Sequence, residues 1–294
     1  MNDKFISESM AAESTEEFTL IRIIDTQYKP NKILLIILPL IFFATFGWYF
    51  YKNTIFVQSL YFALVQTLIV FICWAVGREL DPDYDYAAFL GIPLLFLPFS
   101  LTQGNILVLF WFLFSLRLLN QTTGKRTTSS DVTFYLSLSI LSALLSTQIL
   151  ILPLAIFIIA LTSVISNKKI QLTILSIPLI PSFILFYLVF PDAWMLLNPS
   201  PWILMYIAVS CALMFFVTTT TDKINCKGDH SSTPLSLKRV QSSQIIVVLS
   251  VLLISTFHGS ILSVFPVWAA ITGIGIFRLF HFFIRKEEQV MNKQ

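Results

Sequence analysis

Long apolar runs fill most of this 294-residue chain and constrain its fold more than any other feature. Hydrophobic residues make up 56% of the sequence and charged residues 12%, whereas soluble domains carry about 25% charged residues. Backbone N–H and C=O groups cannot stay unpaired in the hydrocarbon of a bilayer, so such runs must form helices or helical re-entrant pieces. The sequence therefore predicts an all-α fold, a polytopic bundle of membrane helices.

Short polar segments divide the apolar sequence into about ten candidate spans. A complete transmembrane helix needs about 20 apolar residues. The stretches 86–119 and 133–166 are each short for two complete spans, so each is expected to form either two spans or a re-entrant hairpin. The ten candidates are 33–51, 54–76, 86–100, 104–119, 133–147, 149–166, 170–190, 201–219, 244–257 and 261–284.

The spans predict a single membrane domain over residues 33–284, with polar tails at 1–32 and 285–294. The first tail is acidic and lacks the basic start and short apolar core of a cleavable signal. Within it, residues 17–25 have a modest amphipathic pattern. This segment is expected either to lie along the membrane surface as a helix or to be a frayed tail.

Basic residues collect in alternate loops, which predicts the orientation of the chain. With the N-terminus inside, the outer loops hold Lys52 as their one basic residue. Cytoplasmic loops carry an excess of Lys and Arg, so both termini are predicted to be cytoplasmic. We expect a multi-pass protein of the cell membrane, in a bacterial cytoplasmic (inner) membrane. The basic residues assigned to the inner side are Arg22, Lys29, Lys32, Arg78, Lys125, Arg126, Lys168, Lys169, Lys223, Lys227, Lys238, Arg239, Arg285 and Lys286.

An acidic loop separates the second and third candidate spans. Half of the eight acids between positions 33 and 284 lie in the sequence GRELDPDYD, residues 77–85. Alternate carboxylates around Pro82 cannot share one helical face, because neighbours on a helix are three or four residues apart. Pro82 also disfavours the helical conformation at Asp81. The stretch is expected to be a tight loop, with Asp83 able to cap a helix that begins near Tyr86.

The acidic loop is a candidate site for a divalent cation. Mg²⁺ favours oxygen ligands, commonly one or two carboxylates together with water and substrate phosphates. Asp81 and Asp83 are the predicted ligands, with Asp85 and Glu79 as further candidates, and Arg78 would contact phosphate or pair with Glu79. The alternative is a hydrated loop whose acids cap a helix and pair with nearby basic residues.

The next inner loop carries groups suited to binding phosphate. A flexible glycine backbone, hydroxyls and basic side chains can together hold an anion. Arg117 lies near the end of the candidate span 104–119. The alternative for this arginine is that it reaches to the lipid headgroups and has no further role. A re-entrant hairpin over 86–119 would bring this loop beside the acidic one. The candidate phosphate-binding residues are Arg78, Arg117, Asn120, Thr122, Thr123, Gly124, Lys125 and Arg126.

Three classes of function are compatible with these features. The paired loops favour a cytoplasm-facing transferase or hydrolase that uses a divalent metal, Mg²⁺ in particular, on a phosphate-bearing or lipid-linked substrate. A ten-span transporter of small molecules is an alternative, although no acid lies in the middle of a span, where ion-coupled pumps usually carry one. A non-catalytic membrane scaffold or assembly factor is another. The expected partners are the lipid bilayer and a lipid-linked or phosphate-bearing small molecule. No nucleic acid is expected to bind.

Overall fold

The computed structural model describes residues 18–22, 24–96, 104–125, 127–165, 200–229, 234–256 and 261–291, with isolated positions at 180, 181, 184 and 188. Regular structure in these ranges is helical, apart from an isolated bridge between Lys227 and Pro234. The predicted all-α class is therefore confirmed.

Six helices are long and apolar enough to cross a membrane, which indicates a membrane protein with several spans. They are α2 (Lys29–Asn53), α3 (Phe56–Leu80), α6 (Ser129–Ser146), α10 (Pro201–Thr220), α11 (Leu237–Thr256) and α12 (Phe265–Met291). Two shorter apolar helices, α5 (Ile106–Asn120) and α7 (Ile151–Ile165), have 15 residues each. The number of ten spans stays a prediction, because most of the candidate span 170–190 lies outside the described residues.

Local sequence signals determine where several helices begin. Pro30 stands in the first turn of α2, where its missing N–H leaves no hydrogen bond unmade. The side chain of Asn105 accepts hydrogen bonds from the N–H groups of Leu107 and Val108 and caps α5. Thr128 and Asp131 form a reciprocal capping box at the start of α6. Polar residues between the apolar runs thus act as helix starts.

The candidate span 86–100 begins as two short helical pieces, η1 (Ala87–Leu90) and α4 (Gly91–Leu94), between α3 and α12. Glycine allows this close packing. A Cβ atom on Gly273 of α12 would lie 2.4 Å from the backbone nitrogen of Gly91, and one on Gly77 of α3 would lie 2.9 Å from the Cβ of Ala88. A one-turn 3₁₀ helix and a one-turn α-helix therefore replace the start of a continuous span.

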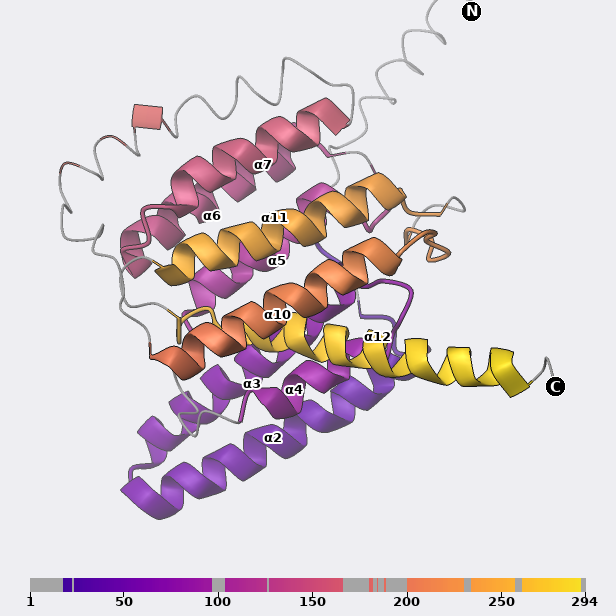
Figure 1. Ribbon diagram of the computed structural model, residues 1–294. Coiled ribbons are helices and arrows are strands. Elements are labelled where there is room, and N and C mark those ends of the chain that lie inside the picture. The colour runs from indigo at the N-terminus through magenta and orange to yellow at the C-terminus, as the bar shows by residue number, and fades with distance from the viewer. Residues whose placement is uncertain are drawn as a thin grey trace, which may run out of the picture.

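The main helices lie side by side in Figure 1, with α2 at one edge and α12 crossing the others at an angle. The side chains of α2 are largely exposed, as expected for a helix that faces lipid. Hydrogen bonds join several helix ends on one side: Arg239 of α11 donates to the carbonyl of Leu119 at 3.1 Å, and Gln244 donates to that of Leu80 at 2.8 Å. We call this side, formed by residues 77–86, 117–128 and 218–229, the polar end.

Candidate functional site

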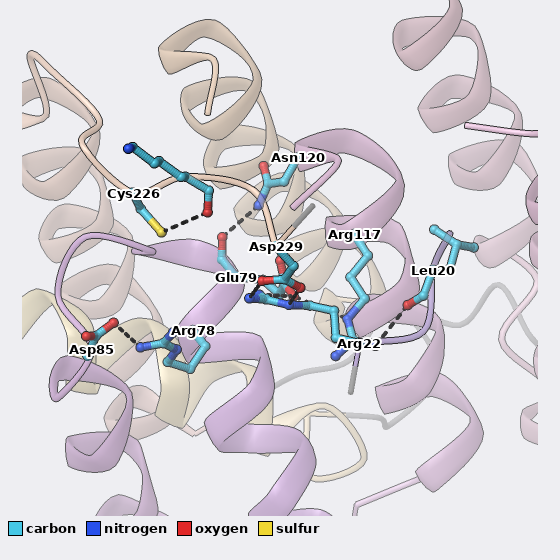
Figure 2. A network of polar contacts seen from close by, with 10 residues as sticks. Leu20, Arg22, Arg78, Glu79, Asp85, Arg117, Asn120, Cys226 and Asp229 are labelled. Atoms are coloured by element: carbon cyan, nitrogen blue, oxygen red, sulfur yellow. Dashed lines mark hydrogen bonds and ion pairs between the residues drawn. The ribbon is translucent and has the colours of Figure 1, made fainter. Parts of the chain in front are cut away.

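A buried glutamate lies at the centre of the polar end. Glu79 belongs to the last turn of α3 and is 1% exposed. Its Oε1 accepts hydrogen bonds from Nη1 of Arg22 at 3.3 Å and from Nε of Arg117, in α5, at 3.2 Å. Figure 2 shows both guanidinium groups converging on this carboxylate. Because a buried charge is stable only when it is paired, these two arginines explain how Glu79 can lie in the interior.

Arg22 joins Glu79 to a loop far away in the sequence. Its Nε and Nη2 donate to the two carboxylate oxygens of Asp229, at 2.7 and 2.6 Å. This bidentate arrangement suits the planar guanidinium. Burial lowers the pKa of Arg22, but Glu79 and Asp229 outweigh that effect and raise the pKa above its ordinary value. Arg22 is therefore charged at any physiological pH.

The second predicted loop folds directly against the first. Nδ2 of Asn120, the last residue of α5, donates to the backbone carbonyl of Glu79 at 2.7 Å. The carbonyl of Thr122 accepts a hydrogen bond of 3.1 Å from the N–H of Asp229. Of the interval between the loops, the described residues form η1, α4 and α5. We call Arg22, Glu79, Arg117, Asn120 and Asp229 the inner cluster.

Several oxygen atoms in and beside the inner cluster are buried without a hydrogen-bond donor among the described residues. They include Oε2 of Glu79, Oδ1 of Asn120 and Oγ1 of Thr122. Oε1 of Gln244 is in the same position, and Oδ2 of Asp81 accepts no hydrogen bond although it forms an ion pair with Arg278. Buried oxygens usually have a partner, so a group of them at one place is notable. Each of these oxygens could accept a hydrogen bond from a ligand or contact a cation.

Asp81 faces a different helix from Glu79. It is 2% exposed, and its Oδ2 lies 3.5 Å from Nε of Arg278 in α12. Nη2 of Arg278 donates to Oγ1 of Thr221 at 2.7 Å, and the guanidinium lies 4.5 Å from the ring centre of Tyr84. Burial raises the pKa of the Asp81 carboxyl to about 7, although Arg278 acts in the opposite direction. Asp81 therefore changes charge near neutral pH.

The other two acids of the loop have further partners of their own. Both oxygens of Asp83 accept hydrogen bonds from the backbone N–H of Asn225, at 3.0 and 2.9 Å, and Oδ1 also accepts one from Cys226 at 2.7 Å. Asp83 therefore holds the 222–229 loop, and the expected capping of a helix near Tyr86 is wrong: no side chain caps η1. Asp85 contacts Arg78 and the hydroxyl of Tyr28.

The predicted metal and phosphate residues are thus brought together only in part. Glu79, Arg117 and Asn120 meet, whereas Asp81, Asp83 and Asp85 each have a different set of partners. Arg78 pairs with Asp85 and not with Glu79, which corrects that expectation. In the described ranges no group of three or more His, Cys, Asp or Glu side chains is placed to hold a metal.

The phosphate-binding candidates of the second loop differ in burial and in backbone conformation. Thr122 and Thr123 are buried, and Gly124 has a φ of 77°, a conformation that glycine adopts without strain. The N–H of Gly124 donates to the carbonyl of Gln121 at 2.8 Å, so this amide contributes to a turn. Lys125 follows that turn, and Arg126 lies outside the described residues.

The sequence does not predict that Arg22, Asp229 and Arg278 take part in the ion pairs at the polar end. The sequence places Arg22 among the inner basic residues and in an amphipathic segment, without indicating a partner, and the 222–229 loop carries no motif. A signal was nevertheless present, because Glu79 and Asp81 adjoin an apolar span and would need basic partners if buried. Comparison with protein families, curated proteins and solved structures gives no match for this chain, so any argument about function starts from the site itself.

Proposed function

We propose that this membrane protein is a divalent-metal-dependent transferase or hydrolase that acts at its polar end, on the cytoplasmic side, on a phosphate-bearing or lipid-linked substrate. One observation carries the proposal: the acidic loop and the following inner loop, separate in the sequence, meet at a buried carboxylate. The Glu79 side chain accepts hydrogen bonds from Arg22 and Arg117, and Asn120 donates to the Glu79 backbone.

The oxygen atoms of the inner cluster support a role in binding Mg²⁺. This ion favours one or two carboxylates, with water and substrate phosphates completing its octahedral shell. Glu79 Oε2 and Asn120 Oδ1 have no hydrogen-bond donor among the described residues. Asp81, two residues further along, is the proposed second carboxylate. Its Oδ2 accepts no hydrogen bond among the described residues but lies 3.5 Å from Nε of Arg278, so Asp81 would leave this ion pair to join Glu79 on the ion. Asp83 and Asp85 are assigned to holding neighbouring loops.

The two arginines of the inner cluster support a role in binding phosphate. Guanidinium groups are well suited to phosphate because several N–H donors lie in one plane. Arg22 and Arg117 converge on Glu79, so a cation that neutralised this carboxylate would release both arginines, and Arg117 of α5 would then be available to bind a phosphate group. The cluster lies at the ends of apolar helices, where a substrate with a lipid tail would present its headgroup.

Thermal unfolding in detergent tests the proposal. Mg²⁺ or Mn²⁺ is expected to stabilise the wild-type protein, since a ligand at ten times its dissociation constant adds about 1.4 kcal/mol to the free energy of unfolding. For a chain of this size this corresponds to a rise of roughly 2 °C in Tm. The variants Glu79→Gln and Asp81→Asn should lose the effect. Asp85→Asn, in the same loop but paired with Arg78, is the matched control and should retain it.

A second candidate is a non-catalytic membrane scaffold, and the pairing pattern favours it. Arg22, Arg117 and Arg278 each have an acidic partner, so the polar end can be explained as a set of internal ion pairs that joins helix ends. The thermal experiment separates the two candidates. If millimolar Mg²⁺ and Mn²⁺ leave the Tm of the wild-type protein unchanged, the scaffold accounts for the structure better than the enzyme.

A further inference from the structure

A short N-terminal segment, Phe18–Arg22, crosses the polar end and contacts three helices and a loop. The described residues of the amphipathic stretch 17–25 are not helical. Thr19 donates from its N–H to Oδ1 of Asp131 at 2.7 Å and from its hydroxyl to Oδ2 at 2.6 Å. Phe18 packs edge-to-face on Phe134 with 5.1 Å between ring centres. These contacts attach the segment to α6.

The same segment continues into the inner cluster. The Leu20 side chain is 2% exposed, and the Leu20 carbonyl accepts a hydrogen bond of 3.0 Å from Nη1 of Arg117. Two residues later Arg22 reaches Glu79 and Asp229 (Figure 2). Ile21 between them is 63% exposed. The segment therefore lies across the cluster, with one face on the protein and the other toward the surroundings.

The anchor at Asp131 can be released without unfolding α6. Besides Thr19, Asp131 accepts hydrogen bonds from the N–H and the hydroxyl of Thr128, at 2.8 and 2.9 Å. This capping box is complete without the N-terminal segment. At the other end, the side chains of Arg22 and Asp229 are 23% and 32% exposed, so water can replace their ion pair. These two attachments can thus open while the helices stay in place, and the Phe18–Phe134 contact and the Leu20–Arg117 hydrogen bond would open with them.

We propose that Phe18–Arg22 is an autoinhibitory strap that competes with the cation for Glu79. This inference rests on the proposed function of the inner cluster. The Arg22 guanidinium and a divalent cation would neutralise the same carboxylate, so bound strap and bound cation oppose each other. Release of the strap removes Arg22 from Glu79 and the Leu20 carbonyl from Arg117. The Glu79 side chain is then available to the cation and the Arg117 side chain to phosphate. Binding of the cation should in turn loosen the strap.

The variant Thr19→Val tests the strap because it removes one hydrogen bond to a charged acceptor and preserves the size of the side chain. Loss of such a bond should increase the released population about tenfold. Thr133→Val is the matched control: Thr133 is exposed on the same helix that holds Asp131, and its hydroxyl bonds to the carbonyl of Ser129. If Thr19→Val does not fold, Phe18→Ala, which removes the contact with Phe134, takes its place.

Two measurements are made on the full chain in detergent. The first is the rate of trypsin cleavage between Arg22 and Ile23, followed by mass spectrometry, which reports release of the strap. The second is the Mn²⁺ concentration at half-maximal thermal stabilisation. For Thr19→Val the cleavage rate should rise about tenfold and the Mn²⁺ midpoint should fall by a similar factor, while Thr133→Val matches the wild type.

The outcomes distinguish the strap from the function on which it rests. Faster cleavage with a lower Mn²⁺ midpoint supports the strap. A Mn²⁺ response at the same midpoint in wild type and Thr19→Val overturns the strap and leaves the proposed metal site standing, whether or not cleavage is faster. No Mn²⁺ response in either protein overturns the metal site and the autoinhibitory role together. Unchanged cleavage in both Thr19→Val and Phe18→Ala overturns the strap as a releasable segment.

Discussion

Glu79 and Asp81 are two residues apart but belong to different parts of the polar end. Glu79 completes the last turn of α3 and faces α5, whereas Asp81 follows the helix and faces Arg278 of α12. Their positions follow from the geometry of the chain: the helix ends before Pro82, and side chains two apart do not share a helical face. One short acidic stretch thus forms ion pairs with both α5 and α12.

The buried carboxyl of Asp81 predicts a pH-dependent stability. Its pKa rises from the model-peptide value of 3.8 to about 7 on folding. Between these values the folded chain binds one more proton than the unfolded chain, so stability decreases as the pH rises through this window. Asp81→Asn cannot titrate. The Tm of Asp81→Asn minus that of wild type should therefore increase from pH 5 to pH 8, as measured by thermal unfolding.

A difference in Tm that stays constant over this pH range would contradict the assignment. It would mean that Arg278 compensates fully for the burial of Asp81 and that the carboxylate is charged throughout. Asp83 adds to the effect in the expected direction, since its proximity also raises the pKa of Asp81. Both variant and wild type should be measured in the same buffer series without divalent ions.

At the scale of the elements, close packing of α12 against the short helices η1 and α4 shapes the bundle. The distances from a Cβ on Gly273 to the backbone, 2.4 Å to the nitrogen of Gly91 and 2.7 Å to the carbonyl carbon of Leu90, exclude any side chain there without movement. This contact places α12, and therefore Arg278, next to the acidic loop.

Gly273→Ala should accordingly destabilise the protein. Overpacking of a well-packed interior typically costs about 1–3 kcal/mol, which should lower Tm by several degrees. Gly47→Ala in α2 is the control, because a Cβ at Gly47 would have nothing within 4 Å, and alanine is the better helix former. Equal melting temperatures for the two variants would show that η1 and α4 do not pack on α12 as described.

The helical elements were predictable from the sequence to different degrees. The apolar runs at 33–51, 54–76 and 201–219 correspond closely to α2, α3 and α10, because a long apolar run has one stable form in a bilayer. The stretch 86–100 was not predictable in the same way. Its first residues form η1 and α4, and this break depends on tertiary contacts with Gly77 and Gly273 that no local pattern reveals.

At the scale of the whole molecule, the polar end gathers residues from all parts of the chain. Arg22, Glu79, Arg117 and Asp229 come from four separate segments and meet in one network. The sequence indicates that the acidic loop and the loop after α5 would meet if residues 86–119 formed a re-entrant hairpin, and the two loops do meet. The contributions of Arg22 and Asp229 were not, because pairing between distant segments depends on how the bundle packs, and single charges in loops carry no spacing signal.

Binding of Mn²⁺ followed by electron paramagnetic resonance tests the central claim most directly. Free Mn²⁺ gives a strong six-line signal that decreases on binding, so a titration yields affinity and stoichiometry without reference to stability. The inner cluster predicts one saturable site per wild-type chain and its loss in Glu79→Gln. If Glu79→Gln binds Mn²⁺ as well as wild type does, or the wild-type chain binds none at millimolar concentration, the inner cluster is not a metal site.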